Sequence, residues 1–313
     1  MSNKEQYIKK FCQSVPVFHQ PFWLDAVAGK NWDVALITKD ERLLASMPFV
    51  FKKTLAGREI IMPHLTQFLG PYYQLTASTY RSRLNEEMDL ISDLLSQIPS
   101  NSIFFQRWHF SFQNWLPFYW ERYRQTVRYT YILENILDHD ILWSQFNEKI
   151  RREIKKAANN YIIEESKDVD AFYWLLKKNL LTKGNRIAFS REVLQNLYNG
   201  CKSNNAGQLW IAKDSSGKID AAIFIVWDRT AAYYLIGGKN PENKNTGTMS
   251  FLFWHAIKTM SERVSVFDFE GSMIKGVENY FRSFGAKQKP YFEIFKTSSI
   301  PASIKFALLK MLK

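Results

Sequence analysis

Two carboxylates stand near the end of a predicted strand at 264–269. Asp268 and Glu270 alternate with phenylalanines and precede Gly271 and Ser272, so a strand directs both carboxylates to one face. Carboxylates at the end of a strand suit acid–base chemistry or the orientation of an amine. They equally suit the capping of a following helix. The residues alone leave both interpretations open.

A glycine precedes a helix predicted at 248–263. In the loop Lys244–Met249, Gly247 stands directly before the first helical residue, Thr248. The first turn of a helix exposes backbone N–H groups and a partial positive charge, which together suit a pyrophosphate. An ordinary turn glycine gives the same pattern, so the loop is a candidate anion site whose sequence does not exclude the simpler reading.

Basic residues cluster on a predicted helix in the middle of the chain: Arg151, Arg152, Lys155 and Lys156. Two pairs of like charge, four residues apart, cost the helix a few tenths of a kcal/mol each. Only Glu148 and Glu153 are near enough in sequence to offset them. The cluster is either a solvated helix face or a phosphate-binding surface, for which the forked donors of arginine are well suited.

Other catalytic patterns are missing from the sequence. The five histidines form no ligand pair at helical or hairpin spacing, so no metal site is expected. No serine stands in a nucleophile elbow, and no complete phosphate-loop or dinucleotide motif occurs. Cys12 and Cys201 are far apart, which predicts two free thiols in a reducing compartment. Covalent catalysis therefore has no visible support.

The composition favours an anionic partner. The chain has 313 residues, 46% of them hydrophobic, a net charge of +12 and a pI near 9.5. This balance fits nucleic acid, a phosphorylated small molecule or an acidic membrane surface without choosing among them. The polar start predicts no secretory leader, and the longest apolar run, 221–227, is too short for a membrane span. We expect a soluble, cytoplasmic protein.

The two halves repeat one order of elements. Hydrophobic periodicity predicts strands at 33–38, 43–51 and 59–62, a helix at 79–97 and a strand at 102–108. The second half predicts strands at 208–213, 219–227 and 231–236, the helix at 248–263 and the strand at 264–269. This repeat predicts a duplicated fold of the α/β (α+β) class, each copy with a mixed, mostly antiparallel sheet flanked by helices.

A helical block separates the halves. An apolar stripe from Leu142 to Tyr161 predicts a helix capped by Asp138 and opened by His139 and Asp140. Two more helices are expected at 169–182 and 190–202, with Gly184 between them.

Three segments together resemble a known superfamily. They are Phe146–Ala157, the loop and helix around Gly247, and Phe267–Ser272 with the following Gly276–Ala286. This combination resembles the FemAB and BioF2-like branch of the GNAT acyltransferases, well over about residues 140–296 and more loosely before. The resemblance implies tandem GNAT-like domains at 1–135 and 136–313.

The resemblance also implies an activity. Members of that branch transfer amino acids from aminoacyl-tRNA to peptidoglycan precursors, and other GNAT proteins use acyl-CoA. We therefore expect an acyltransferase that moves an acyl or aminoacyl group to an amine acceptor, such as a cell-envelope precursor. The acceptor, anionic or phosphorylated, would lie in the cleft between the domains.

The same resemblance implies roles for particular residues. The donor, acyl-CoA or aminoacyl-tRNA, would bind at a pyrophosphate loop aligned on Lys244, Gly247, Thr248 and Met249. The amine would attack the bound ester or thioester directly, without a covalent enzyme intermediate. Asp268 or Glu270 would accept the amine's proton, and Tyr280 would donate to the leaving group. Substrate binding is assigned to the four basic residues Arg151, Arg152, Lys155 and Lys156 together with Ser272.

Two rival interpretations remain. One is a non-catalytic basic module that binds RNA or an anionic membrane, with aromatic side chains stacking on bases. The other is a GNAT-fold pseudoenzyme that binds an anionic ligand. A steep dependence of binding on salt would mark a binder of many phosphates. The sequence does not indicate the oligomeric state.

The C-terminal segment predicts an amphipathic helix. Pro301 fits an early helical position and Ser299 a cap. One face is apolar, and lysines add positive charge: Ile304, Ala307, Leu308, Met311 and Leu312 on that face, with Lys305, Lys310 and Lys313. The helix either docks on the second domain or rests on the inner leaflet of a membrane.

Overall fold

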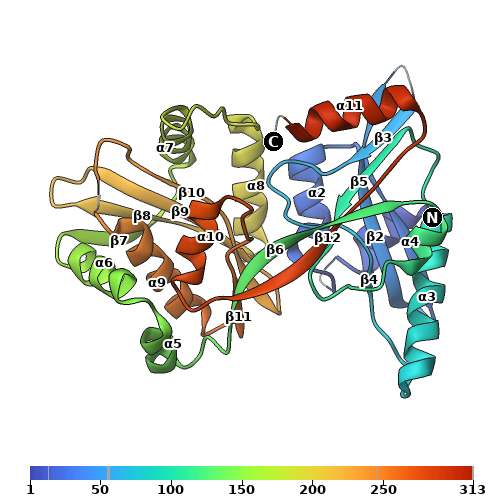
Figure 1. The fold of residues 1–313 in the computed structure, drawn as a ribbon, viewed down its shortest axis with the longest axis horizontal. Coiled ribbons are helices and arrows are strands. Elements are labelled where there is room, and N and C mark those ends of the chain that lie inside the picture. Colours follow the sequence, from blue (N-terminus) through green and yellow to red (C-terminus); the bar gives the residue numbers. More distant parts are fainter. Residues whose placement is uncertain (13, 55–56, 245, 312–313) are drawn as a thin grey trace. The chain divides into compact units, whose positions relative to one another are not determined.

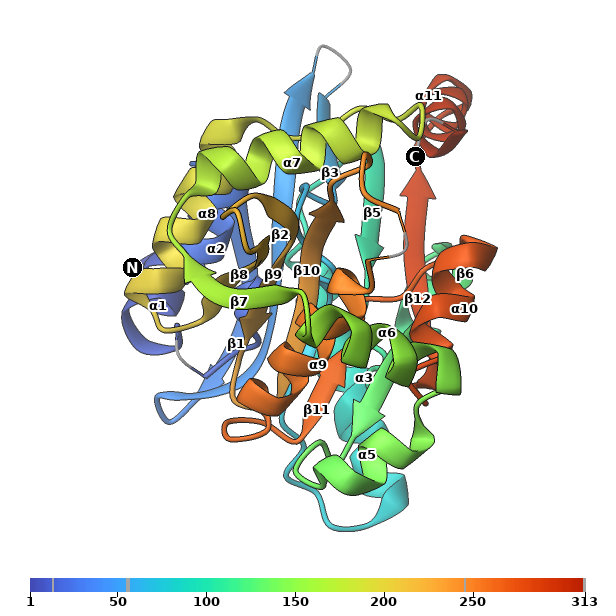
Figure 2. The same ribbon diagram turned by 90° about the vertical axis from the view of Figure 1, so that its left-hand side faces the viewer.

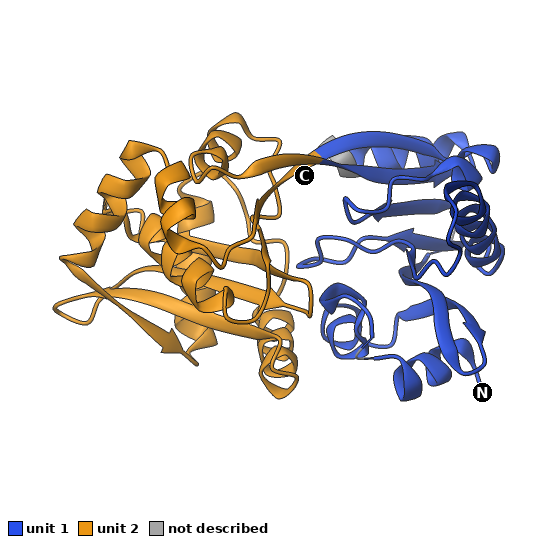
Figure 3. Cartoon of the chain, turned by 90° about the horizontal axis from the view of Figure 1, so that it is seen from below, with its two compact units in different colours: residues 1–128, 290–313 blue, residues 129–289 orange. Residues whose placement is uncertain are grey.

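The chain forms two compact units in the computed structural model, which describes residues 1–12, 14–54, 57–244 and 246–311. Unit 1 comprises residues 1–128 and 290–313, and unit 2 comprises residues 129–289 (Figure 3). We describe each unit by itself.

Unit 1 is a mixed sheet between two layers of helices (Figure 1). Its elements are α1 (Asn3–Lys10), η1 (Val17–His19), α2 (Pro21–Ala28), β1 (Trp32–Lys39), β2 (Arg42–Thr54), β3 (Gly57–Ile61), β4 (Tyr72–Tyr73), α3 (Tyr80–Ser96), β5 (Ile103–Arg107), α4 (Leu116–Trp120) and α11 (Ile300–Met311). The strands β6 (Arg124–Glu134) and β12 (Lys287–Thr297) each divide between the two units.

The sheet of unit 1 buries both of its faces. Strand β2 pairs antiparallel with β1 and with β3, and β3 pairs parallel with β5. Along β2, Leu43 and Val50 join a core with α1, α2 and α11, whereas Met47 and Phe49 join a second core with α3 and α4. This explains why the alternation of apolar and polar residues in β2 is imperfect, because neither face meets water.

Unit 2 repeats this plan with more helices. Its elements are α5 (His139–Gln145), α6 (Glu148–Ala158), β7 (Tyr161–Ser166), α7 (Val169–Leu181), α8 (Arg191–Ser203), β8 (Gly207–Asp214), β9 (Ile219–Trp227), β10 (Ala231–Lys239), α9 (Thr248–Met260), β11 (Val266–Asp268) and α10 (Lys275–Arg282) (Figure 2).

The strands of unit 2 lie in the order β6-β11-β10-β9-β8-β7. The β10–β11 pair is parallel, and the other pairs are antiparallel. Alternate residues of β9 point to opposite faces. Ile223 and Ile225 join the core around α9, and Phe224 on the other face meets Tyr198 of α8.

The predicted repeat of element order is confirmed. In each unit, three antiparallel strands lead through a helix to a strand that pairs parallel with the third: β1-β2-β3-α3-β5 and β8-β9-β10-α9-β11.

The last strand of each sheet comes from the other half of the sequence. The final residues of β6, 132–134, pair antiparallel with β11 in unit 2, and residues 293–297 of β12 pair antiparallel with β5 in unit 1. The compact units therefore have bounds that differ from a cut between residues 135 and 136. The domains at 1–135 and 136–313 stay a prediction about the two copies in the sequence.

The single helix predicted through the apolar stripe is wrong. The helix α5 ends at Gln145, Phe146 is extended, and Asn147 caps α6 by accepting the Lys149 N–H at 2.9 Å. Tyr161, the end of the predicted stripe, is the first residue of β7. The stripe continued across the break because Leu142, Phe146 and Ile150 contribute to one hydrophobic core.

The terminal helix α11 packs on unit 1, which corrects its expected docking on the second domain. Ser299 accepts the Ala302 N–H, as predicted for a cap. Ala302 and Phe306 are buried, and the Phe306 ring contacts Phe105 and Phe295. Of the predicted apolar face, Ile304 and Leu308 are exposed. The side chains of Lys310, Met311, Leu312 and Lys313 lie outside the described part of the chain.

Candidate active site

The candidate site lies in unit 2, where α9 begins against the backbone of α6. Gly247 is the N-cap of α9 and has a φ of 77°, a left-handed conformation that favours glycine. A Cβ on this residue would stand 2.3 Å from the carbonyl oxygen of Glu153 in α6. Only glycine lets the two helices approach this closely. The first turn of α9, with its partial positive charge, is therefore fixed against α6.

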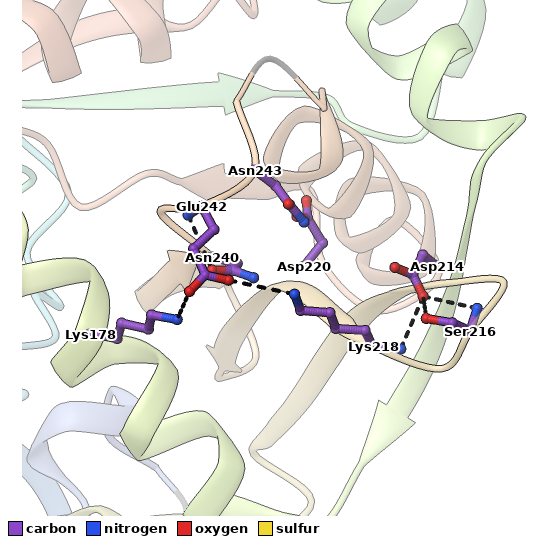
Figure 4. Close-up of polar contacts among 8 residues, drawn as sticks. All are labelled: Lys178, Asp214, Ser216, Lys218, Asp220, Asn240, Glu242 and Asn243. Carbon is purple, nitrogen blue, oxygen red and sulfur yellow. Dashed lines mark hydrogen bonds and ion pairs between the residues drawn. The ribbon is translucent and has the colours of Figure 1, made fainter.

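A buried carboxylate holds the loop before α9. Asp220 of β9 is 1% exposed and accepts hydrogen bonds from Asn243 Nδ2 at 2.6 Å, Thr246 Oγ1 at 2.8 Å and Thr248 Oγ1 at 2.6 Å. Its backbone carbonyl accepts the Asn240 N–H at 2.6 Å. Figure 4 shows Asp220 beside Asn243. Donors from both ends of the loop thus converge on one residue, and bonds to a charged acceptor are among the stronger ones.

The outer side of this loop is tied by surface ion pairs. Glu242 accepts from Lys178 of α7 at 2.6 Å and from Lys218 at 3.5 Å (Figure 4). Near Lys218, Asp214 closes the β8–β9 turn by accepting from Ser216 and from the Lys218 N–H. These side chains are exposed, so each ion pair adds little stability. The pairs orient the loop, and Asp220 anchors it.

The predicted donor-binding residues divide by how they contribute. The Thr248 hydroxyl is committed to Asp220, and the Met249 side chain packs against the hydrophobic core. For Gly247, Thr248 and Met249, the backbone of the first turn is therefore the part suited to an anion. Lys244 is exposed in the loop and can place its ammonium group near that turn. Their role in donor binding stays a prediction.

The two predicted carboxylates stand at the end of β11 and in the left-handed turn that follows it. The strand β11 ends at Asp268, and both Glu270 and Gly271 have positive φ, at 57° and 65°. Asp268 is 3% exposed, accepts from Thr130 Oγ1 and from the Glu270 N–H at 2.7 Å, and acts electrostatically on Tyr233. Glu270 acts electrostatically on Tyr234, the next residue of β10. After Asp268 the backbone therefore turns and does not continue the strand.

Burial raises the pKa of Asp268 to about 6, while the bonds from Thr130 and from the Glu270 N–H partly counter this rise. The carboxylate therefore changes charge near neutral pH. Its two donors hold the turn at Glu270, and the chain caps no helix with it, because Ile274 is the N-cap of α10.

Tyr280 joins α10 to the start of α9. Its hydroxyl is 2.8 Å from Oγ of Ser250, the third residue of α9, and Ser250 Oγ donates to Glu153 Oε2 at 2.7 Å. Burial and, to a lesser degree, the charge of Glu153 raise the pKa of Tyr280 well above its usual range. Tyr280 also interacts electrostatically with Tyr234, and Tyr234 with Glu270. Tyr234 is thus the electrostatic neighbour that Glu270 and Tyr280 share.

A scan against family models matches residues 144–282 to the acetyltransferase (GNAT) domain. The match covers α6, the loop before α9, β11 and α10, which are the elements that build this site. Residues 144–282 thus match the GNAT domain family.

Solved structures of similar fold extend the likeness to both units. The chain superposes on FemX with a TM-score of 0.67 and 12% identity, over 93% of this chain and 96% of FemX. It also superposes on L-PGS from Bacillus licheniformis, with a TM-score of 0.55 and 12% identity over 90% and 89% of the two chains. None of the curated protein sequences matches the chain.

At identities this low, the superpositions show the fold. The predicted tandem GNAT-like fold, with mixed, mostly antiparallel sheets flanked by helices, is confirmed, as is the likeness to the FemAB branch at the level of the fold. A third similar structure is the C-terminal domain of a protein assigned as a lysylphosphatidylglycerol synthetase from Agrobacterium fabrum, with a TM-score of 0.58, 12% identity and coverage of 99% and 98%.

The basic cluster of the GNAT domain lies on the outer face of α6. Arg151 donates to the carbonyl oxygens of Trp143 and Ser144, and so satisfies the end of α5. Arg152 is exposed, 3.8 Å from Glu148, and Lys155 and Lys156 are exposed as well. The structure therefore gives Arg151 a structural partner, whereas a substrate-binding role of the cluster stays a prediction.

Ser272 makes a local turn, because its hydroxyl accepts the Ile274 N–H at 3.0 Å. Within the described residues, no three His, Cys, Asp or Glu side chains are grouped as a metal ion would require. In the same part of the chain, no helix has both the length and the apolar character needed to cross a bilayer.

Three residues of the candidate site are not predicted from the sequence. In the sequence, Glu153 is only a counter-charge in the basic helix, and Ser250 is only part of the helix after Gly247. Asp220 carried a signal, because it is the one acid in the strand Ile219–Trp227, which is otherwise apolar. A carboxylate at such a position must find donors when it is buried.

The Gly247→Ala substitution should destabilise the protein by roughly 2–4 kcal/mol, because a Cβ would meet the Glu153 carbonyl and the left-handed φ would be strained. Urea unfolding measures the loss. The matched control is Gly276→Ala in α10, where a Cβ meets no atom within 4 Å; it should stay within about 1 kcal/mol of the original. Equal effects of both would contradict the close contact.

The Asp268→Asn substitution should change how stability depends on pH. The folded-state pKa of about 6 lies above the usual aspartate pKa of 3.8, so the native protein loses stability as pH rises through this window. Asparagine keeps an acceptor for both donors and carries no charge. Relative to the original, the variant should therefore gain about 2–3 kcal/mol in unfolding free energy between pH 4 and pH 7. A pH-independent difference in urea unfolding would show that Asp268 does not titrate there.

Proposed function

We propose that the chain is an N-acyltransferase that moves an acyl or aminoacyl group from an activated donor to an amine acceptor. One observation carries the proposal: the Tyr280 hydroxyl meets the same first turn of α9 that begins at Gly247. An anionic donor held at that turn would have its leaving group beside the Tyr280 hydroxyl. Holding both in one place supplies the positioning on which direct transfer depends.

The donor is acyl-CoA or aminoacyl-tRNA, and Lys244, Gly247, Thr248 and Met249 form its phosphate site. Both donors carry phosphates, and the end of α9 offers backbone N–H groups and a positive dipole. The GNAT domain favours acyl-CoA. The similar fold of a protein assigned as a lysylphosphatidylglycerol synthetase supports an aminoacyl donor as the second choice.

Transfer proceeds by direct attack. Glu270 takes the proton that converts an incoming ammonium to the nucleophilic amine, and Asp268 holds the backbone of Glu270 in place. Tyr280 donates a proton to the leaving group. A cysteine intermediate is not part of this scheme, because Cys201 is fully buried and burial raises the pKa of its thiol far above neutral.

The acceptor is an anionic or phosphorylated amine, such as a cell-envelope precursor. Arg152, Lys155 and Lys156 present their charges on the outer face of α6, in the helix that carries Glu153. Ser272 lies two residues after Glu270 and can contribute a hydroxyl to the same acceptor.

Release of thiol from acyl-CoA in the presence of amines tests the function. The chain should release CoA, and Tyr280→Phe, which keeps the buried ring, should lower kcat by about 10²-fold or more. Each donor should also raise the melting temperature. At a donor concentration a hundredfold above its Kd, the unfolding free energy should increase by about 2.7 kcal/mol. This stabilisation should survive in Tyr280→Phe. If neither acyl-CoA nor aminoacyl-tRNA stabilises the chain or reacts, the proposal fails.

We propose further that α11 rests on an anionic membrane surface. Its inner side anchors Ala302 and Phe306, and its outer side exposes Ile300, Ile304 and Leu308 at 78%, 58% and 56%. These three residues recur every fourth position, so they form one apolar stripe. With the strong net positive charge of the chain, the stripe fits the interface of an anionic leaflet.

Sedimentation with vesicles tests this contact. The full chain should bind vesicles of anionic phospholipid, and a double variant, Ile304→Ser with Leu308→Ser, should bind several-fold less. Tyr80→Ser in α3 removes another exposed apolar side chain and should leave binding unchanged. No binding by the original chain, or an equal loss in both variants, would refute the contact.

A further inference from the structure

Three hydroxyl and carboxyl groups from three helices form a continuous hydrogen-bonded chain in unit 2. Glu153 of α6, Ser250 of α9 and Tyr280 of α10 are linked at 2.7 Å and 2.8 Å, with Ser250 Oγ in the middle. Ser250 is buried, whereas the Glu153 side chain is 29% exposed. The hydrogen-bonded chain therefore leads from a partly buried tyrosine to a group that can exchange protons with water.

The chemistry of the groups fixes the direction of these bonds. An ionised carboxylate only accepts, so the single hydroxyl proton of Ser250 goes to Glu153. Toward Tyr280, Ser250 Oγ then has only a lone pair, so it accepts the hydrogen bond and Tyr280 donates it. In this state the Tyr280 oxygen offers only lone pairs to the rest of the site. It can accept a proton there before it can donate one.

We propose that Glu153 and Ser250 are positioning residues that let Tyr280 relay a proton in acyl transfer, first accepting one proton and then donating one. The inference rests on the proposed function. As the amine nitrogen bonds to the acyl carbon, it passes a proton to Tyr280; Tyr280 passes its own to Ser250, and Ser250 passes its own to Glu153, which becomes neutral.

This proton shift reverses the direction of both hydrogen bonds. Glu153 now donates to Ser250, Ser250 donates to Tyr280, and the proton on Tyr280 points into the site. When the bond from the acyl carbon to the leaving sulfur or oxygen breaks, the leaving atom keeps the electron pair and takes that proton. The three groups return to their first state. One proton has moved from the amine to the leaving group, and no other reactant is consumed.

The charged groups around Glu153 and Tyr280 suit this movement of protons. Lys149, on the same helix, places its ammonium group 4.0 Å from the Glu153 carboxylate. Tyr234 of β10 and Tyr280 interact electrostatically, and the Glu270 carboxylate acts on Tyr234. Negative charge near a partly buried tyrosine disfavours tyrosinate, so Tyr280 passes its proton on instead of storing the charge. Glu153, the exposed end, is where the proton can rest.

Kinetics of three variants separate a relay from a structural role. Glu153→Gln and Ser250→Ala should each lower kcat by about 10²-fold, with KM for the donor changed less than threefold. Glu153→Gln should also abolish the acid limb of the kcat–pH profile, since the first proton shift needs the carboxylate. Ser250→Thr restores a hydroxyl and should recover most of the rate. Glu148→Gln, an exposed glutamate of the same helix, is the control and should match the original.

A second measurement does not depend on activity. With 3-fluorotyrosine in all 15 tyrosine positions, the ¹⁹F resonance of Tyr280 is the one missing from Tyr280→Phe. Its shift should step as acid protonates Glu153 and reverses the direction of both hydrogen bonds, and the step should vanish in Glu153→Gln but persist in Glu148→Gln. A step that persists in Glu153→Gln would overturn the relay.

The two proposals can fail separately. Acyl transfer that is unaffected by Glu153→Gln and Ser250→Ala would overturn the relay and leave the proposed function standing. An original chain that transfers from neither acyl-CoA nor aminoacyl-tRNA would overturn the proposed function, and with it the use of the relay.

Discussion

The site depends on the close approach of α9 to α6 at Gly247. The backbone of Glu153 occupies the space that a side chain at residue 247 would need. The same contact carries the Glu153 carboxylate to Ser250, one turn into α9, and Ser250 meets Tyr280. A single missing Cβ thus brings the positive end of one helix, a surface carboxylate and a buried hydroxyl together. Asp220 stabilises the arrangement by binding the loop that leads to Gly247.

The sheet of unit 2 supplies the other half of the cluster. Strands β10 and β11 run parallel, and the register of β10 with β9 shifts between Tyr234 and Ile236. Irregularities of this kind re-aim side chains beside active sites. After the neighbouring strand β11, Glu270 stands in a left-handed turn, and its charge acts on Tyr234. Both residues thus lie at local departures from regular strand geometry.

Much of the fold could be predicted from the sequence, because each half carries its own periodicity. The strands at 33–38 and 43–51, the helix after Gly247 and the repeated order of elements all follow from local patterns. The exchange of β6 and β12 could not, since each pairs with a strand far away in the sequence, and the backbone groups that pair are the same for every residue type. The break at Phe146 and Asn147 was hidden because α5 and α6 face the same core.

The site was predicted in part for a similar reason. Gly247 and Tyr280 stand in local motifs, and Ser250 links them, because it lies in the first turn of α9 and bonds to Tyr280. Asp268 and Glu270 share a motif and stay bonded through the Glu270 N–H, in a turn at which Gly271 approaches the Tyr129 carbonyl. Glu153 and Ser250 lie 97 residues apart and meet only through helix packing. Contacts of this kind depend on tertiary structure, so neither residue's own neighbourhood in the sequence could reveal them.

An amide NMR titration of the full chain with acetyl-CoA, and separately with an aminoacyl-tRNA, tests the central claim most directly. If the first turn of α9 binds the phosphates of the donor, the backbone resonances of Thr248, Met249 and Ser250 should move first and furthest with at least one donor. Saturating binding of both donors that leaves these three resonances in place would contradict it.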